Sequence, residues 1–441
     1  MVDTVAPKNP MARVMSLRDF RLLFGGATTS LLGDQFALIA TPWLILQLTG
    51  DPLALGIVLA LEGVPRALFM LIGGAITDRL SPRLIMLISD LIRFVLTGLM
   101  AFVVFTGIVQ VWMLYVFGLG FGLVAGFAIP AENSIVPMLV QEQDLQAGNS
   151  LMMGVTQLVG FVGPTIAGIL IGGYSKSGLG IGLAFAVDAL SFAVSAACLW
   201  LIRSARRKSG AALFAEKETL WGSIMTGIKF LWEDKPLRLM FLVMMALNFL
   251  VVGPLLVGIP VLANQRLPEG AVAFGLLMSA YAGGNLGGYL MAGALPRPTS
   301  IGIRVILIGL MFGFGVVIGF LGFIPSTWID FALLLVLGLA NGYVSIILIT
   351  WMQTNTPREM LGRIMSILMF AGVGLVPVSQ AISGAVSKWD LDLLFASAGV
   401  LILLVMFWMA FQPALKTFSE SLASPKVDEA GSPQTGIADR I

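Results

Sequence analysis

The sequence has 441 residues and a formal net charge of +2; 58% of its residues are hydrophobic and only 11% are charged. A soluble domain carries about 25% charged residues. This chain therefore has too few charges to cover the water-facing surfaces that a soluble protein of its length would need. The near-neutral charge gives no sign of a nucleic-acid partner. Composition excludes an ordinary soluble protein and favours a membrane protein.

Residue types that the sequence lacks exclude several kinds of chemistry. There is no histidine, which removes histidine metal sites, haem ligands and histidine proton relays. The single cysteine, Cys198, cannot form an intrachain disulfide. The sequence contains no GxxxxGKS/T phosphate loop, so it is not a P-loop ATPase. We expect a protein that is not an enzyme and that has no cofactor and no metal site.

Long apolar runs predict an all-α integral membrane fold with 12 transmembrane helices in two six-helix halves. Such runs cross a bilayer as helices because the backbone must satisfy its hydrogen bonds within the segment. The first six predicted spans are 20–48, 52–77, 84–107, 111–139, 145–172 and 180–202. The second six are 237–262, 272–294, 302–323, 327–350, 360–386 and 391–411. The first run is too long for a cleaved signal peptide, so we expect it to be a retained helix.

Polar segments divide the chain into an N-terminal half (1–202), a linker (203–236), a C-terminal half (237–411) and a tail (412–441) predicted to be disordered. Apolar residues in the linker recur at helical spacing and predict an amphipathic helix on the cytoplasmic membrane surface. They are Leu220, Trp221, Ile224, Ile228 and Leu231. Lysine and arginine concentrate in the N-terminal segment, the linker and the tail. This distribution predicts that both termini are cytoplasmic.

The loop between the second and third spans carries a charge motif, Gly74-Ala-Ile-Thr-Asp78-Arg79-Leu-Ser-Pro-Arg83. It resembles the G-x-x-x-D-R-x-G-R-R/K motif of the major facilitator superfamily, although a serine and a proline replace a glycine and the first basic residue. The resemblance implies a cytoplasmic gate in which the Asp78 carboxylate faces the positive N-terminal end of helix 11.

The start of helix 11 is predicted at Thr356-Pro357-Arg358-Glu359, which has the pattern of a capping box with proline in the first turn. The same resemblance implies that Thr356, Glu359 and Arg363 are gate partners on that helix.

A finer resemblance extends from about Leu17 to Phe411. The sequence is similar to the drug-efflux branch that includes macrolide and enterobactin exporters, the transmembrane secretion effector type. Matching stretches include Leu32-Gly33-Asp34-Gln35, Asp90-Leu-Ile-Arg93 and Asp188-Ala-Leu-Ser-Phe192. In helix 5, Gly163, Pro164 and Gly168 are similar to an antiporter element, with close packing of small residues as the alternative.

Charged residues inside the predicted spans are the candidates for coupling, because each is costly in the membrane unless it is paired or hydrated. Asp34 lies near the middle of the first span, and Glu132 lies about 12 Å into the fourth. The resemblance implies that both spans line the central cavity. We predict these two residues as proton-coupling acids. A structural hydrogen bond for Asp34 and a gate role for Glu132 stay open.

Three further sets of charges have other predicted roles. Glu62 and Arg66 share one helix face and predict an ion pair, the alternative being that Arg66 faces Asp34 or a substrate anion. Asp90 and Arg93 lie near the predicted cytoplasmic end of helix 3 and are expected to support the gate, with a role in transport as the alternative. Asp188 is interpreted as a structural residue on a peripheral helix.

The spans of the second half contain essentially no acids, and their polar residues at depth are neutral. We predict Asn248, Asn285, Asn341 and Gln380, together with Gln35 of helix 1, as candidates that orient a substrate in the cavity. The alternative is that they only link helices. The asymmetry predicts that the coupling charges lie in the N-terminal half.

These observations predict a secondary transporter that exports amphipathic, lipophilic small molecules such as drugs, macrolides or siderophore-like compounds in exchange for protons. Its expected partners are the substrate, protons and the lipid bilayer, and it is expected to work as a monomer in a bacterial cell membrane. A lipid or lysolipid flippase or a nutrient importer of the same fold is one alternative. A membrane scaffold without transport activity is another.

Overall fold

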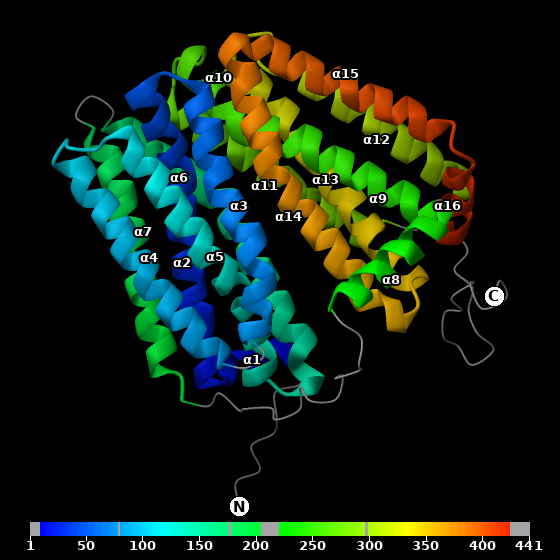
Figure 1. The fold of residues 1–441 in the computed structure, drawn as a ribbon, viewed down its shortest axis with the longest axis horizontal. Coiled ribbons are helices and arrows are strands. Elements are labelled where there is room, and N and C mark those ends of the chain that lie inside the picture. The colour runs from blue at the N-terminus through cyan, green and yellow to red at the C-terminus, as the bar shows by residue number, and fades with distance from the viewer. Residues whose placement is uncertain (1–8, 78–79, 175–177, 204–219, 296–298, 424–441) are drawn as a thin grey trace, which may run out of the picture. The chain divides into compact units, whose positions relative to one another are not determined.

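The structure, a computed structural model, describes residues 9–77, 80–174, 178–203, 220–295 and 299–423. Within these ranges the regular elements are helices (Figure 1). The chain divides into two compact units. Unit 1 comprises Met1–Ala215 and Ala263–Ser279, and unit 2 comprises Glu216–Leu262 and Ala280–Ile441. The predicted boundaries at 202 and 237 stay a prediction.

Unit 1 contains six long helices that follow one another along the chain, coloured blue to green in Figure 1. They are α2 (Arg18–Thr49), α3 (Pro52–Thr77), α4 (Pro82–Phe105), α5 (Val111–Leu139), α6 (Leu145–Gly173) and α7 (Leu179–Leu201). A short helix, α1 (Pro10–Ser16), precedes them, and a 3-10 turn, η1 (Glu142–Asp144), leads into α6. All six long helices begin and end within about two residues of the predicted spans.

Unit 2 contains the second set of long helices. The first is a continuous segment made of α9 (Lys235–Leu247), the π-helical η3 (Asn248–Val252) and η4 (Pro254–Gly258), and α10 (Ile259–Gln265). The others are α11 (Ala271–Ala294), α12 (Ser300–Phe320), α13 (Thr327–Asn355), α14 (Arg358–Trp389) and α15 (Leu391–Ala410). The last residues of α10 and the first residues of α11 belong to unit 1. Two shorter helices, α8 (Leu220–Glu233) and α16 (Pro413–Ala423), flank this set.

Ten helices of the described ranges are long and apolar enough to cross a membrane. They are the six long helices of unit 1, the α9–α10 segment, α12, α13 and α15. Helices α11 and α14 have 24 and 32 residues and occupy the positions of the predicted eighth and eleventh spans. Both are therefore also long enough to span a bilayer. The predicted all-α membrane fold is confirmed.

Prolines, glycines and capping side chains explain where several helices begin and end. Pro82 occupies the first turn of α4, where a missing N–H group costs no hydrogen bond. Gly50 ends α2 with a φ of 61°, a left-handed conformation that glycine adopts without strain. Asp234 caps α9 by accepting a hydrogen bond from the Leu237 N–H group at 2.8 Å.

Glycines allow the helix backbones of each unit to approach closely. In unit 1, a Cβ atom added to Gly122 of α5 would collide with the Glu62 carbonyl oxygen of α3. In unit 2, a Cβ atom added to Gly342 of α13 would collide with the Asn285 carbonyl oxygen of α11. Close packing of small residues is a main source of helix association in membranes.

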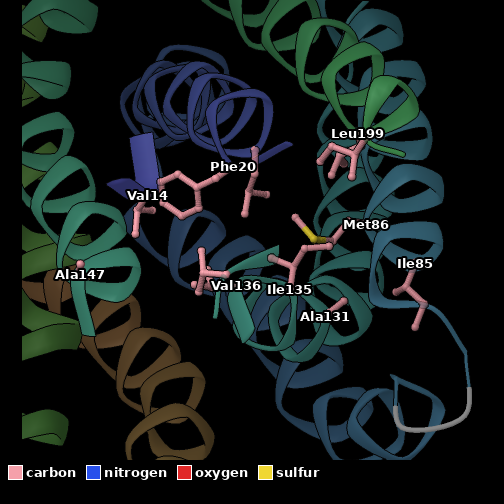
Figure 2. Packing of buried hydrophobic residues seen from close by; sticks show 12 residues of the cluster. Val14, Phe20, Ile85, Met86, Ala131, Ile135, Val136, Ala147 and Leu199 are labelled. Carbon is pink, nitrogen blue, oxygen red and sulfur yellow. The ribbon is translucent and has the colours of Figure 1, made fainter. Parts of the chain in front are cut away.

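Twelve buried hydrophobic residues form a cluster at one end of unit 1, which we call the end cluster (Figure 2). They are Val14, Phe20, Leu23, Ile85, Met86, Ala131, Ile135, Val136, Val140, Ala147, Leu199 and Ile202. The cluster joins α1 to the first turns of α2, α4 and α6 and to the last turns of α5 and α7. Removing this much apolar surface from water stabilises that end of the bundle.

Helix α1 is also held by a charged contact. The Arg13 Nε donates to both carboxylate oxygens of Asp144, at 2.9 and 3.0 Å, and its Nη2 donates to one of them. These hydrogen bonds and the charge of Asp144 raise the pKa of Arg13. The guanidinium thus contacts both oxygens of the carboxylate in a bidentate ion pair.

The predicted disordered tail is wrong for Pro413–Ala423, which form α16. Phe418 is fully buried, and its ring packs edge-on against Trp351 of α13 with 4.6 Å between ring centroids. The Trp351 Nε1 donates to the Ser421 Oγ at 2.8 Å. The serine- and proline-rich composition of the tail obscured this short apolar segment, whose partner is far away in the sequence. Residues 424–441 lie outside the described ranges.

The linker helix predicted from periodicity is present as α8. A Cβ atom added to Gly227 would lie 2.8 Å from Ile367 and 3.2 Å from Arg363, so α8 packs against α14. Leu231 is buried, whereas Ile228 is exposed. One side of α8 therefore packs on unit 2, and its predicted place on the membrane surface stays a prediction.

The capping box predicted at Thr356–Glu359 is wrong. Thr356 ends α13, and its N–H group donates to the Met352 carbonyl oxygen at 3.1 Å. The Thr356 hydroxyl is buried and has no hydrogen-bond partner among the described residues. Helix α14 begins at Arg358 with no side-chain cap, because Pro357 precedes it in an extended conformation and cannot accept such a bond. The side chain of Glu359 lies outside what the structure describes.

Candidate functional site

Arg93 is at the centre of a group of charged side chains in unit 1. It lies midway along α4, and 13% of its side chain is exposed. Its guanidinium lies over the Phe192 ring of α7, 5.4 Å from the ring centroid, in a cation–π contact. The Arg93 Nη1 is 3.7 Å from the Oε1 of Glu132 on α5. This distance is too long for a hydrogen bond, so the ion pair is loosely held.

Four carboxylates from four helices surround Arg93. They are Glu132 of α5, Asp34 of α2, Asp90 of α4 and Asp188 of α7. Asp90 and Asp188 are 5% and 1% exposed, Asp34 is half-buried, and 46% of the Glu132 side chain is exposed. We call these five residues the Arg93 cluster. It brings together the two predicted coupling acids.

The Arg93 cluster contains more acidic than basic groups. With every acid ionised, four carboxylates would face one guanidinium. Uncompensated charge in a membrane-spanning segment is costly unless it is neutralised or hydrated. Such an arrangement can exchange protons for a positively charged ligand. Among the described residues, no group of three acidic or cysteine side chains is placed to hold a metal ion.

Asp188 is the member of the cluster whose position the sequence did not predict. It packs against α2, where a Cβ atom added to Gly33 would lie 2.7 Å from its Oδ1. Gly33 directly precedes Asp34, so the two acids lie close together. One feature of the sequence does indicate that Asp188 lies on a buried face rather than at the periphery. Ser191 and Ser195 follow it at three and seven residues and place a polar stripe on one face of α7.

Asp90 and Arg93 were expected to support the gate. The structure groups Arg93 with Asp34 and Glu132, which favours the alternative of a role in transport. Their part in a gate stays a prediction.

The ion pair predicted on α3 is present. The Arg66 Nη2 donates to the Glu62 Oε1 within hydrogen-bond distance, one helical turn apart. The pair neutralises itself, and Arg66 is paired with Glu62 rather than with Asp34. It therefore differs from the loose contact between Arg93 and Glu132.

The predicted antiporter-like residues of α6 lie in close helix contacts. A Cβ atom added to Gly163 would lie 2.5 Å from the Gln35 side chain of α2. A Cβ atom added to Gly168 would lie 2.6 Å from the Ala271 carbonyl oxygen of α11, and the Pro164 carbonyl is also closely approached by α11. These contacts fit the close-packing alternative. They also place Gln35 against α6, and its predicted contact with substrate stays a prediction.

Only part of the predicted gate motif lies in the described ranges. Asp78 and Arg79 lie outside them, whereas Gly74 is in α3 and Arg83 is in the first turn of α4. The Arg83 guanidinium donates to the carbonyl oxygens of Leu199 and Trp200, at 2.6 and 2.7 Å. It thus caps the carbonyl end of α7 within unit 1, where the helix dipole favours a cation. The gate itself stays a prediction.

The neutral polar candidates of unit 2 mostly bond to protein groups. The Asn341 Nδ2 of α13 donates to the Asn285 Oδ1 of α11 at 2.8 Å, which links the two helices. Asn248 donates to the Met244 carbonyl oxygen within its own helix at 2.9 Å. Gln380 is buried in α14, and its Oε1 has no hydrogen-bond partner among the described residues.

Unit 2 also contains one buried acid, which corrects the expectation of essentially none. Asp330 lies in the first turn of α13 and accepts a hydrogen bond from the Gly322 N–H group at 3.0 Å. It was overlooked because one acid near the end of a span does not interrupt the apolar run from which the span was predicted. Its position at a helix start is where a carboxylate is favoured.

Comparison with known proteins identifies the family. The sequence model of the Major Facilitator Superfamily matches residues 23–378. This chain is a transporter of the major facilitator superfamily. It is 26% identical to the multidrug efflux pump Tap of Mycolicibacterium fortuitum over 90% of this chain and 96% of the relative. It is 22% identical to the macrolide efflux protein A of Streptococcus pyogenes over 79% of this chain and 84% of the relative. The predicted likeness to drug exporters is confirmed.

Solved structures agree with the fold. The D-xylose-proton symporter superposes with a TM-score of 0.68 at 13% identity, over 88% of this chain and 96% of that one. A bacterial homologue of the human lysosomal transporter Spinster superposes with a TM-score of 0.65 at 14% identity, over 92% of this chain and 96% of that one. These likenesses establish the fold of a multi-pass membrane transporter.

Proposed function

We propose that this transporter exports amphipathic, lipophilic small molecules in exchange for protons, and that the Arg93 cluster couples the two movements. The observation that supports this most strongly is the excess of carboxylates around one loosely paired guanidinium. Protons and a cationic substrate can neutralise the same excess, so the binding of one disfavours the other. Competition of this kind is the basis of antiport, because the two ligands are then carried in turn.

Asp34 and Glu132 have different environments in the cluster, which suggests different roles. Glu132 is the more exposed acid, and its Oε1 lies 3.7 Å from the Arg93 Nη1. Asp34 is half-buried beside the glycine contact between α2 and α7. We assign Glu132 to the first contact with a substrate cation and Asp34 to the proton that replaces it. When a proton neutralises either acid, the attraction on Arg93 weakens and the guanidinium can shift toward the remaining carboxylates.

The direction and the substrate class rest on similarity and chemistry together. Two relatives are named as efflux proteins, one for multiple drugs and one for macrolides. An acid-rich site in apolar helices suits a lipophilic molecule that carries a positive charge. We further propose that the two six-helix halves alternate in access, that both termini are cytoplasmic in a bacterial cell membrane, and that the protein works as a monomer.

Transport in liposomes tests this function. The purified protein is reconstituted, a pH gradient is imposed, and movement of a lipophilic cationic dye is followed for the wild type, Asp34→Asn and Glu132→Gln. The wild type should move dye against its gradient at the expense of the proton gradient. Each variant should lose about tenfold or more of that activity, because one exchangeable charge of the cluster is gone.

The matched control is Glu142→Gln, the same change at an exposed acid of η1 outside the cluster. It should transport like the wild type. Dye movement by the wild type that ignores the pH gradient would contradict proton antiport and favour a lipid flippase or a facilitator. Gradient-driven transport retained in both cluster variants would show that the coupling acid lies elsewhere.

A further inference from the structure

Helix α7 has one buried polar face in an otherwise apolar span. Asp188, Ser191 and Ser195 follow one another at three and four residues, which places them on the same side of the helix. All three are buried. From Asp188 to Ser195 this face covers about 10 Å along the helix axis.

Glycines of α2 bring backbone directly against this face. A Cβ atom added to Gly33 would collide with the Ser191 hydroxyl, and one added to Gly26 would lie 3.5 Å from the Ser195 Oγ. The polar face is therefore covered by glycines rather than by apolar side chains. The Ser191 hydroxyl donates to the Asp188 carbonyl oxygen of its own helix at 2.7 Å. The hydroxyl and carboxyl groups thus lie along one narrow, buried seam.

The two ends of the polar face have buried acids. At one end the Asp90 carboxylate of α4 is hydrogen-bonded to the Ser195 hydroxyl. At the other end Asp188 lies beside Gly33 and Asp34. The Asp90 Oδ2 and the Asp188 Oδ1 are both buried without a hydrogen-bond partner among the described residues. A buried carboxylate oxygen without a donor is costly, and a bound proton removes that cost.

The charged surroundings of this face come from each helix packed against α7. Asp34 comes from α2, Asp90 and Arg93 come from α4, and Glu132 comes from α5 by way of Arg93. Helix α6 also packs against α7 and has no titratable residue in its sequence. One cation, Arg93, thus faces all the acids of the seam.

Beyond Asp90 the seam ends in the apolar end cluster. Met86 lies one helical turn before Asp90 on α4, and Leu199 lies one turn after Ser195 on α7, and both belong to the end cluster (Figure 2). A proton that reaches Asp90 therefore meets a layer of hydrocarbon before it meets water at that end. The seam therefore begins and ends at acids of the Arg93 cluster, and the end cluster closes it beyond Asp90.

We propose that the polar face of α7 is a proton-transfer path that connects Asp188, beside Asp34, to Asp90 through the hydroxyls of Ser191 and Ser195. Each hydroxyl accepts one proton and passes on its own, so a proton gained by one carboxyl group is lost by the other. Arg93 then compensates whichever acid is ionised. This inference rests on the proposed proton coupling and names the residues through which the proton moves.

The contact between α12 and α15 in unit 2 shows that close packing alone does not require such a face. A Cβ atom added to Gly315 of α12 would lie 2.6 Å from the Leu403 side chain and 3.0 Å from the Gly399 carbonyl oxygen. These neighbours are apolar side chain and backbone. Close packing by itself therefore does not require the serines and acids found at the contact of α7.

Two variants of the reconstituted transporter test the path. Ser195→Ala removes one transfer group at little cost in packing, and Asp188→Asn removes the acid at one end. Their matched controls are Ser397→Ala, at a half-buried serine of α15, and Asp330→Asn, at the buried acid of α13. Two rates are measured for each protein. One is dye efflux driven by a pH gradient, and the other is dye exchange at equal pH, which needs no net proton transfer.

The path predicts that Ser195→Ala and Asp188→Asn slow gradient-driven efflux by about tenfold, because proton transfer becomes limiting. Exchange by Ser195→Ala, which leaves every acid of the Arg93 cluster in place, should stay near the wild-type rate, and both controls should keep both rates. Equal losses of efflux and exchange in Ser195→Ala would indicate a structural role and overturn the path. Unchanged efflux in both variants would overturn it as well. A wild type whose efflux ignores the pH gradient would instead overturn the proton coupling itself, and the path with it.

Discussion

The two units bury their polar groups in different ways. Unit 1 gathers four carboxylates around Arg93, with the charges drawn from α2, α4, α5 and α7. Unit 2 joins α11 and α13 through a neutral pair, Asn285 and Asn341. Its buried acid, Asp330, lies in the first turn of a helix rather than among other charges. Helices that pack in the same way thus hold a cluster of charged side chains in unit 1 and a neutral hydrogen-bonded pair in unit 2.

The packing that the two units share is made by glycine. Gly122 of α5 meets the backbone of Glu62, and Gly342 of α13 meets the backbone of Asn285. In both cases the glycine approaches the backbone of a polar residue that belongs to a candidate site. Close backbone contact fixes the positions of the Cα atoms that carry these polar side chains. The chemistry of the side chains then determines what each unit can bind.

The largest effects are expected from filling these contacts. Gly122→Leu and Gly342→Leu should each abolish the folded transporter, because the added side chain would overlap a carbonyl oxygen of the facing helix. The measurement is the yield of monodisperse protein after extraction in mild detergent. Gly98→Ala and Gly313→Ala are the controls, since a Cβ atom at either glycine meets nothing within 4 Å.

If Gly342→Leu folded normally while Gly122→Leu did not, the two units would not share the same packing constraint, and the likeness between them would be only apparent.

The next largest effect separates charge from packing. Arg93→Met keeps much of the side-chain volume but leaves the acids of the cluster without their cation. The buried acids Asp90 and Asp188 would then have no cation beside them, which is destabilising. We expect lower thermal stability and loss of gradient-driven transport. Thermal unfolding in detergent and the liposome assay measure the two effects.

Arg66→Met is the comparison within the same unit. Among the described residues, Glu62 is the one partner of the Arg66 side chain at hydrogen-bond distance. The loss of Arg66 should therefore affect stability and leave proton coupling in place. Equal loss of coupling in both variants would contradict the assignment of coupling to the Arg93 cluster.

Sequence alone predicted the helices closely and the site incompletely, for a physical reason. Bilayer thickness sets span length, so apolar runs mark α3 and α5 to within the residue. Asp34 and Glu132 could be predicted as candidates from the sequence, because an acid within an apolar run carries a free-energy cost in the membrane whichever way its side chain points. What joins them to Arg93 and Asp188 is helix rotation and pairing, which depend on contacts between distant segments. The glycines at 26 and 33 that decide those contacts look like ordinary membrane glycines in the sequence.

A smaller effect is expected from the neutral pair of unit 2. Asn341→Leu removes the hydrogen bond to Asn285. Hydrogen bonds between membrane helices contribute about 0.6 kcal/mol on average and at most about 1.7 kcal/mol. We expect a slightly lower melting temperature and proton-driven transport close to that of the wild type. Loss of transport without loss of stability would favour the alternative that the pair orients a substrate.

The smallest effect, that of Arg13→Gln, belongs to a second contrast, between the short helices that flank each unit. Helix α16 is held by a buried ring, so Phe418→Ala should cost about 3–5 kcal/mol. Helix α1 is held in part by Arg13 and Asp144, and Arg13 is partly exposed. The loss in Arg13→Gln should therefore be smaller and should shrink further as salt is added, because exposed charges are screened. Salt should leave the Phe418→Ala effect nearly unchanged.

The pH dependence of the Arg13 contact follows from its raised pKa. The folded pKa lies above the ordinary value of arginine, so the stability that the charged guanidinium contributes is fully present below that ordinary value. It is lost only as the pH rises through the folded value. The difference in melting temperature between the wild type and Arg13→Gln should thus stay constant between about pH 6 and pH 9. A difference that disappeared within this range would mean that another group, and not Arg13, titrates at this contact.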